Sequence, residues 1–103
     1  MTKKASRPFK ETSKELLKDP ECAALYLEEC LADGDIELFK LALKNVADAR
    51  IGGMSALADK TSLGRESLYK SLSKAGNPKL ETLTKILSAT GLRLSISPIE
   101  KTT

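Results

Sequence analysis

Polar side chains able to hydrogen-bond with nucleic acid gather between residues 54 and 74 of this 103-residue chain. Arg65 and Lys70 are candidates for guanine contacts, because an arginine can donate two hydrogen bonds to O6 and N7. Glu66 can accept from a cytosine amine or orient Arg65, and Lys74 can make a salt-dependent contact with a phosphate. Ser67 and Tyr69 suit contacts with phosphates or thymine methyl groups, and Ser55 suits a contact with a phosphate. Gly64 is expected in the turn directly before Arg65. These residue types predict binding to double-stranded DNA.

Two short helices joined by a tight turn would position these side chains. Ser55 is a good N-cap for the first helix, the pattern breaks at residues 61–64, and a second helix is expected from about Arg65. Small Ala58 suits the close crossing of two helices near a right angle. The apolar residues that would face inward are Leu57, Leu63, Leu68 and Leu72. This layout predicts a helix-turn-helix over about 54–74, and an ordinary helical hairpin with a polar outer face is the alternative.

Motifs along most of the chain agree with this prediction and point to a family. They are LGRESLYKSLS at 63–73, GNP at 76–78, GLRL at 91–94, ALYLEE at 24–29 and DGD at 33–35. Together, over about residues 17–98, they closely resemble the addiction-module antidote proteins, small antitoxins with a phage-repressor-like helix-turn-helix. The resemblance implies a RelE-like toxin encoded beside this chain, direct binding of that toxin, and repression of their shared operon. The chain departs from the family at Ser62, where Gly is usual, and at Gly64, where Ser is usual.

The composition limits the chemistry available to the chain. There is no histidine, which removes the commonest general base and the commonest metal ligand. Cys22 and Cys30 are eight residues apart in a predicted helix, about 12 Å along its axis, which is too far for a disulfide. Two thiols alone do not make a zinc site. We therefore expect no catalytic residues, no metal site and no cofactor, and the chain is not expected to be an enzyme.

The charge and hydropathy of the whole chain favour a small helical protein. Net charge is +3, 41% of residues are hydrophobic and 30% are charged, which is typical of a compact domain. No apolar run approaches the roughly 20 residues that span a bilayer, and no signal peptide is apparent, so a cytoplasmic location is expected.

The expected fold is all-α, a five-helix lambda-repressor-like helix-turn-helix domain with a short C-terminal β-strand. The domain would cover residues 17–98, after a basic, loosely ordered arm at 1–16 and before a tail at 99–103. Asp19 and Asp35 are expected to cap the first two helices, and Leu80 is expected on the inner face of the last one.

Acidic residues are concentrated between positions 19 and 37, where there are seven and no lysine or arginine. One interpretation is a solvated helix face with favourable charges at the helix starts. The other is a docking surface for a basic protein, which a ribonuclease toxin would suit electrostatically.

Residues 92–97 alternate strictly between apolar and polar, which predicts a strand that Pro98 ends. A lone strand leaves its backbone groups unpaired, so a partner outside the chain is expected. Antiparallel pairing with a second copy would make a homodimer through Leu92, Leu94 and Ile96. Addition to a toxin's sheet, or an extended tail packed on the helices, are the alternatives.

Three functions fit these observations. The first is an antitoxin of a type II toxin-antitoxin module that neutralises a RelE-like ribonuclease and represses its own operon. The second is a stand-alone phage-repressor-like transcriptional regulator without a toxin. The third is a protein-interaction adaptor whose helical hairpin does not bind DNA. A short basic reading frame beside the gene would favour the first over the second, and salt-dependent duplex binding would exclude the third.

Overall fold

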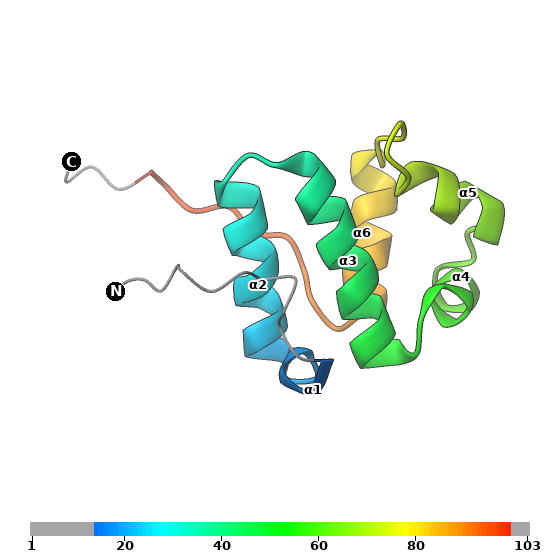
Figure 1. Cartoon of the computed structure of the whole chain (residues 1–103), viewed down its shortest axis with the longest axis horizontal. Helices are drawn as coiled ribbons and strands as arrows, with labels where there is room; N and C mark the ends of the chain where they lie inside the picture. Colours follow the sequence, from blue (N-terminus) through cyan, green and yellow to red (C-terminus); the bar gives the residue numbers. More distant parts are fainter. Residues whose placement is uncertain (1–13, 100–103) are drawn as a thin grey trace.

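The computed structural model describes residues 14–99, and this part of the chain consists of helices and connecting segments (Figure 1). The helices are α1 (Lys14–Leu17), α2 (Pro20–Ala32), α3 (Ile36–Ile51), α4 (Met54–Thr61), α5 (Arg65–Ser71) and α6 (Leu80–Ala89). The predicted all-α class is confirmed. The prediction of five helices with a C-terminal β-strand is wrong, because α1 adds a sixth helix and the described residues contain no strand.

Helices α2 and α3 form a hairpin whose ends follow from local sequence. The Asp19 carboxylate accepts a hydrogen bond from the Cys22 N–H at 3.0 Å, directly before Pro20 begins α2. The Asp35 carboxylate accepts from the Leu38 N–H at 3.0 Å and starts α3 in the same way. Both predicted caps are confirmed. The two helices contact each other along their lengths and lie side by side in Figure 1.

Helix α3 passes through the middle of the molecule and contributes most to the core. It contacts α1, α2 and α4, while α4 also contacts α5 and α6. Its buried apolar residues are Phe39, Ala42, Leu43, Val46 and Ala47. Near its end, the Arg50 guanidinium donates to the carbonyl oxygens of Lys18 at 2.5 Å and Thr90 at 2.6 Å. Arg50 therefore joins the start of α2 to the end of α6.

The segment after α6 is extended but forms no ladder with any described part of the chain. The Leu92 N–H donates to the Leu87 carbonyl at 2.8 Å, which closes the end of α6, and the Leu92 side chain packs on the core. Leu94 is 38% exposed and Ile96 is 98% exposed. The strand prediction, which depended on the alternation alone, is therefore wrong. A ladder requires a neighbouring strand, and residues 14–99 contain none.

The predicted N-terminal arm and C-terminal tail lie mostly outside the described residues. Residues 1–13 of the predicted arm and 100–103 of the predicted tail lie outside the described residues, while Lys14–Leu17 form α1. Leu17 is buried in the core, which explains why this short helix docks. Within residues 14–99, no helix is long and apolar enough to cross a membrane.

Candidate functional site

Helices α4 and α5 are joined by the three residues 62–64, and a buried threonine shapes this turn. The Thr61 hydroxyl donates to the Leu57 carbonyl at 2.7 Å and accepts from the Leu63 N–H at 3.2 Å. Ser62 then adopts a left-handed conformation with φ of 64°. The inner side of the unit is apolar as predicted, since Leu57, Ala58, Leu68 and Leu72 are buried, although Leu63 is only half-buried.

Helix α5 presents most of the predicted DNA-binding residues on one short exposed element. Only Leu68 of its seven residues is buried. Gly64 is the exposed residue immediately before the helix, and Lys74 is exposed three residues after it. The exposed predicted residues within the helix are Arg65, Glu66, Ser67, Tyr69 and Lys70. The structure therefore brings the side chains of α5 together, whereas Lys74 lines a separate hollow with Asp35 and Glu37 at the start of α3. The contacts of all these residues with DNA stay a prediction.

Ser55 does not have the capping role that the sequence predicted. Helix α4 begins at Met54, its N-cap is Gly53, and no side chain caps it. The N-cap is therefore two residues earlier than predicted, at a glycine with φ of 117°. The N-cap prediction is therefore wrong. Ser55 is an exposed residue of the first turn, and its proposed phosphate contact stays a prediction.

Sequence reasoning missed Lys40, a buried lysine of α3 that holds the chain directly after α5. Its side chain is 3% exposed, and its ammonium donates to the carbonyl oxygens of Ser73 at 2.7 Å, Lys74 at 3.2 Å and Gly76 at 2.6 Å. The Glu37 carboxylate forms a salt bridge with the same ammonium, with 3.4 Å between Oε2 and Nζ. These three carbonyls belong to the loop after α5, and the three donors of one ammonium can reach all of them. The Ser73 carbonyl also accepts from the Gly76 N–H at 3.1 Å.

Gly76 brings the same loop against α5. A Cβ built at this position would overlap the Lys70 carbonyl oxygen, and it would lie 2.9 Å from the Lys70 carbonyl carbon and 3.0 Å from the Ser71 oxygen. Only a glycine allows this approach of backbone to backbone. The GNP motif at 76–78 marked a turn in the sequence, but nothing in it indicated the contact with α5.

A hollow of about 380 Å³ lies between α5, this loop and the start of α6. It joins two predicted residues, Ser67 and Lys70, with polar residues that the prediction left out. These additional residues are Ser71, Asn77, Lys79 and Thr82. Lys79 in particular extends the basic character of α5 toward α6, and the periodicity of a single helix could not have indicated this.

Charge is distributed unevenly between the two halves of the chain. Residues 60–85 contain six basic residues against two acidic ones, whereas residues 19–37 contain seven acidic and no basic residues. The basic set is Lys60, Arg65, Lys70, Lys74, Lys79 and Lys85. In Figure 1, α2 and α5 lie at opposite ends of the molecule. The α5 end is therefore the one suited to a polyanion.

The unusual turn residue gives a testable effect. Ser62→Gly should stabilise the protein by about 0.5–1 kcal/mol. A Cβ in the left-handed region costs about 1–2 kcal/mol, and the larger backbone entropy that glycine loses on folding offsets part of this gain. Thermal unfolding of both proteins checks this, with Ser88→Gly as the control, since Ser88 lies within helix α6 and is not among the residues with positive φ. The control should lose stability, and a loss at position 62 as well would contradict the assigned turn geometry.

The thiols do not form a reactive or metal-binding group in the described residues. Burial raises the pKa of the Cys30 thiol to about 11, so the thiol is protonated at neutral pH. A hydrogen bond with Asp19 is the main cause that raises the pKa of Cys22. Both cysteines are free, and residues 14–99 contain no cluster of three or more cysteines and carboxylates placed to hold a metal ion.

The described residues form a small all-helical protein. Its short polar helix α5 is exposed and rests on a buried apolar core. The chain matches the family model described as probable addiction module antidote protein over residues 8–98, and it belongs to that family. A protein of Haemophilus influenzae (strain ATCC 51907 / DSM 11121 / KW20 / Rd), described as an uncharacterized protein, is 40% identical over 82 residues, 80% of this chain and 82% of its own length. No solved structure matches the chain. Membership of this family supports an antitoxin role and implies a partner toxin.

Proposed function

We propose that this chain is the antitoxin of a type II toxin-antitoxin module, which binds and neutralises a RelE-like ribonuclease toxin and represses its own operon. The observation that carries the proposal is the combination of the antidote family with an exposed polar α5 held on buried α4 and α3. In this proposal the chain acts in the cytoplasm, by binding and not by catalysis.

The α4–α5 unit would act as a helix-turn-helix. Its two short helices, three-residue turn and apolar inner side have the form of that motif, in which the second helix enters the major groove. The basic residues from Lys60 to Lys85 would add phosphate contacts on either side of α5.

A homodimer would place two copies of α5 on successive half-sites, about 34 Å apart along the DNA. Of the three residues predicted at the dimer interface, Leu94 and Ile96 are exposed, whereas Leu92 packs on its own core. Dimerisation through the C-terminal segment therefore depends on Leu94 and Ile96 in our proposal.

Arg65→Ala should weaken binding to the operator by about 1–3 kcal/mol and relax specificity at one base pair in each half-site. The reason is the loss of two hydrogen bonds to guanine from a side chain that is exposed on α5. Electrophoretic mobility shifts on DNA from upstream of the gene measure this. Arg93→Ala, which removes an exposed arginine away from α5, should bind as the wild type does. Equal affinity of the two variants would show that α5 is docked differently.

The antitoxin role is tested by co-expressing the untagged chain with a tagged product of the adjacent reading frame and measuring the mass of the purified complex by light scattering. A stable complex with two copies of this chain supports the antitoxin and the homodimer. If the chain purifies alone as a dimer that binds the operator, it is a stand-alone regulator.

A further inference from the structure

A small groove lies on the side of the molecule away from α5, between α2, α3, α6 and the C-terminal segment. Its volume is about 110 Å³, and most of its lining is apolar. Helix α2 contributes Leu27 and Leu31, α6 contributes Leu87, and the C-terminal segment contributes Leu94. We call this feature the α2 groove. Leu31 is 43% exposed and Leu94 is 38% exposed, so the apolar surface continues out of the groove.

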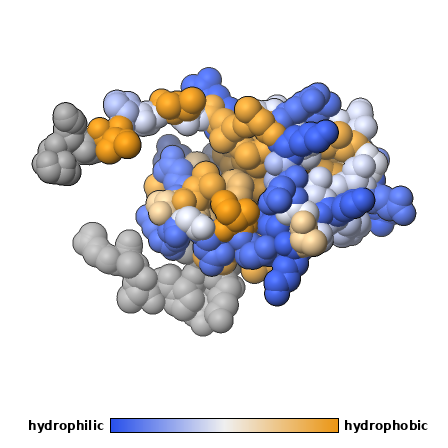
Figure 2. Space-filling view, turned by 90° about the horizontal axis from the view of Figure 1, so that it is seen from above, coloured by the Kyte–Doolittle hydropathy of each residue, from blue (hydrophilic) through white to orange (hydrophobic). Residues whose placement is uncertain are grey.

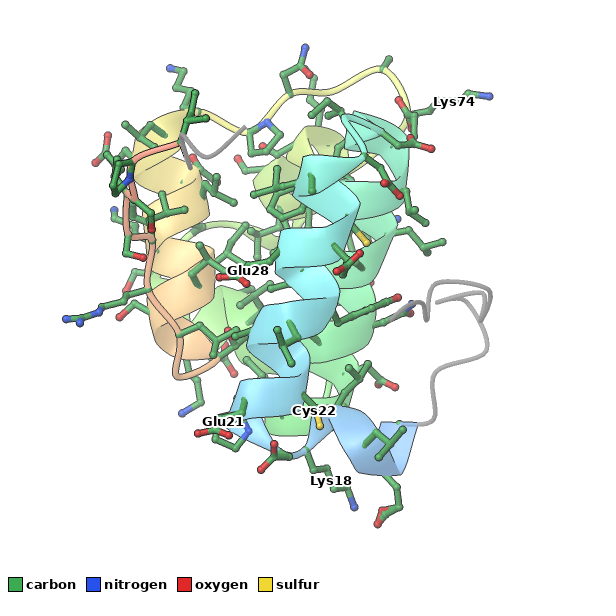
Figure 3. All side chains as sticks on the ribbon, turned by 90° about the vertical axis from the view of Figure 1, so that its left-hand side faces the viewer. Lys18, Glu21, Cys22, Glu28 and Lys74 are labelled. Atoms are coloured by element: carbon green, nitrogen blue, oxygen red, sulfur yellow. The ribbon has the colours of Figure 1, made fainter. Side chains whose placement is uncertain are left out.

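Acidic side chains border the α2 groove along the helix. Glu28 lines the groove itself, and Glu21 lies seven residues earlier, which is about two helical turns and therefore the same side of α2. Figure 3 shows both carboxylates on the side of α2 that faces the C-terminal segment. No salt bridge within residues 14–99 involves either of them. The groove lining also includes a cation, Arg93, which belongs to the C-terminal segment. The α2 side of the groove carries acidic charge only.

Further exposed apolar side chains lie on α2 and on the C-terminal segment, outside the lining of the groove. Leu25 on α2 is 59% exposed, and Ile96 and Ile99 of the C-terminal segment are 98% and 90% exposed. Figure 2 shows apolar side chains of this segment projecting away from the body of the protein. Exposed apolar side chains at a groove with a polar edge, such as Leu31 here, are typical of protein-binding sites.

We propose that the α2 groove is the surface that binds the partner toxin, through an apolar side chain of the toxin flanked by lysine or arginine. This inference rests on the proposed antitoxin function and names the surface that performs it. The apolar side chain would enter between Leu31 and Leu87, and the flanking cations would lie against Glu21 and Glu28. The exposed Ile96 of the C-terminal segment would remain free for the homodimer. Electrostatic complementarity of this kind selects the partner and speeds its association.

The charges favour this occupant over two others. A second copy bound through the α2 groove would form a two-fold interface, in which Glu21 and Glu28 of one copy would lie against the same two acids of the other. Such like-charge contact is unfavourable. DNA is excluded from this face by the same acids, because they repel phosphates. Since α2 and α5 lie at opposite ends of the molecule, the toxin would leave α5 open to the operator (Figure 1).

The test reverses the charges that border the α2 groove. Wild-type chain and the double variant E21K/E28K are titrated against the purified product of the adjacent reading frame by calorimetry. The variant should bind at least tenfold more weakly, because two attractive contacts become repulsive. The matched control is D59K/E81K, which makes the same charge change on α4 and α6. Glu81 lies in the first turn of α6, as Glu21 lies in the first turn of α2. This control should bind the toxin as the wild type does.

A second variant tests the apolar part of the α2 groove without altering charge. Leu31→Ser removes a side chain that is already 43% exposed, so the fold should be retained, and toxin affinity should fall several-fold. Circular dichroism and operator binding are measured for each variant. If E21K/E28K and Leu31→Ser bind the toxin as tightly as the wild type, the α2 groove is not the toxin site, and the antitoxin role stands. If the wild type itself does not bind, the antitoxin role and this inference both fail.

Discussion

Lys40→Met should lower the free energy of unfolding by about 3 kcal/mol, with a fall in Tm of more than about 10 °C. The lysine ammonium is buried and donates to the carbonyl oxygens of Ser73, Lys74 and Gly76. Methionine has a similar length and leaves no large cavity, but it donates no hydrogen bond. The partly buried carbonyls of Lys74 and Gly76 would then lose the Lys40 ammonium as their donor, and this desolvation penalty is the main contribution.

Lys44→Met is the matched control for this effect. Lys44 lies one turn further along α3, is half-buried, and makes no hydrogen bond or salt bridge with the described residues. Its replacement should change stability by less than about 0.5 kcal/mol. Chemical denaturation followed by circular dichroism measures both variants. If Lys40→Met unfolds at the same denaturant concentration as Lys44→Met, the ammonium does not hold the loop after α5.

Gly76→Ala should be nearly as damaging, with a loss of about 3 kcal/mol, the upper part of the range for overpacking. The new methyl group would overlap the Lys70 carbonyl oxygen, and the neighbouring backbone atoms leave it no other space. Relief requires the loop to move away from α5. That movement would also carry the Gly76 carbonyl away from the Lys40 ammonium.

Gly64→Ala tests whether the loss is specific to this close approach. Gly64 has φ of −69°, and a Cβ there would meet no atom within 4 Å. Its replacement should change the free energy of unfolding by less than about 1 kcal/mol. Both substitutions remove a glycine near α5, so a similar loss at the two positions would contradict the assigned contact. The double variant of Lys40→Met and Gly76→Ala should lose less than the sum of the single losses, because both act on one loop.

Several elements could be predicted because their signals are local. Asp19 and Asp35 cap their helices as predicted, since the capping carboxylate bonds to a backbone N–H only three residues away. Leu68 is buried and its neighbours on α5 are exposed, since helical periodicity alone separates the two faces.

The errors arose where a distant part of the chain decides the outcome. Residues 92–97 alternate like a strand, but they form no ladder because no other described segment is extended beside them. Leu80 has the spacing of a core residue and is 68% exposed, because it begins α6 beyond the end of the core. No sequence pattern singled out Lys40, because its three acceptors are more than thirty residues away in sequence.

By itself, the sequence determined the all-α class, the helix starts at Asp19 and Asp35, and the identity of the polar residues on α5. These depend on interactions within one or two helical turns, which the order of residues specifies directly. Only the tertiary structure decided that Lys40 and Gly76 fix the loop after α5, and that α2 and α6 enclose an apolar groove with an acidic edge. Those features require backbone and side-chain atoms from separate helices to approach within contact distance, and periodicity along one helix carries no information about such approaches.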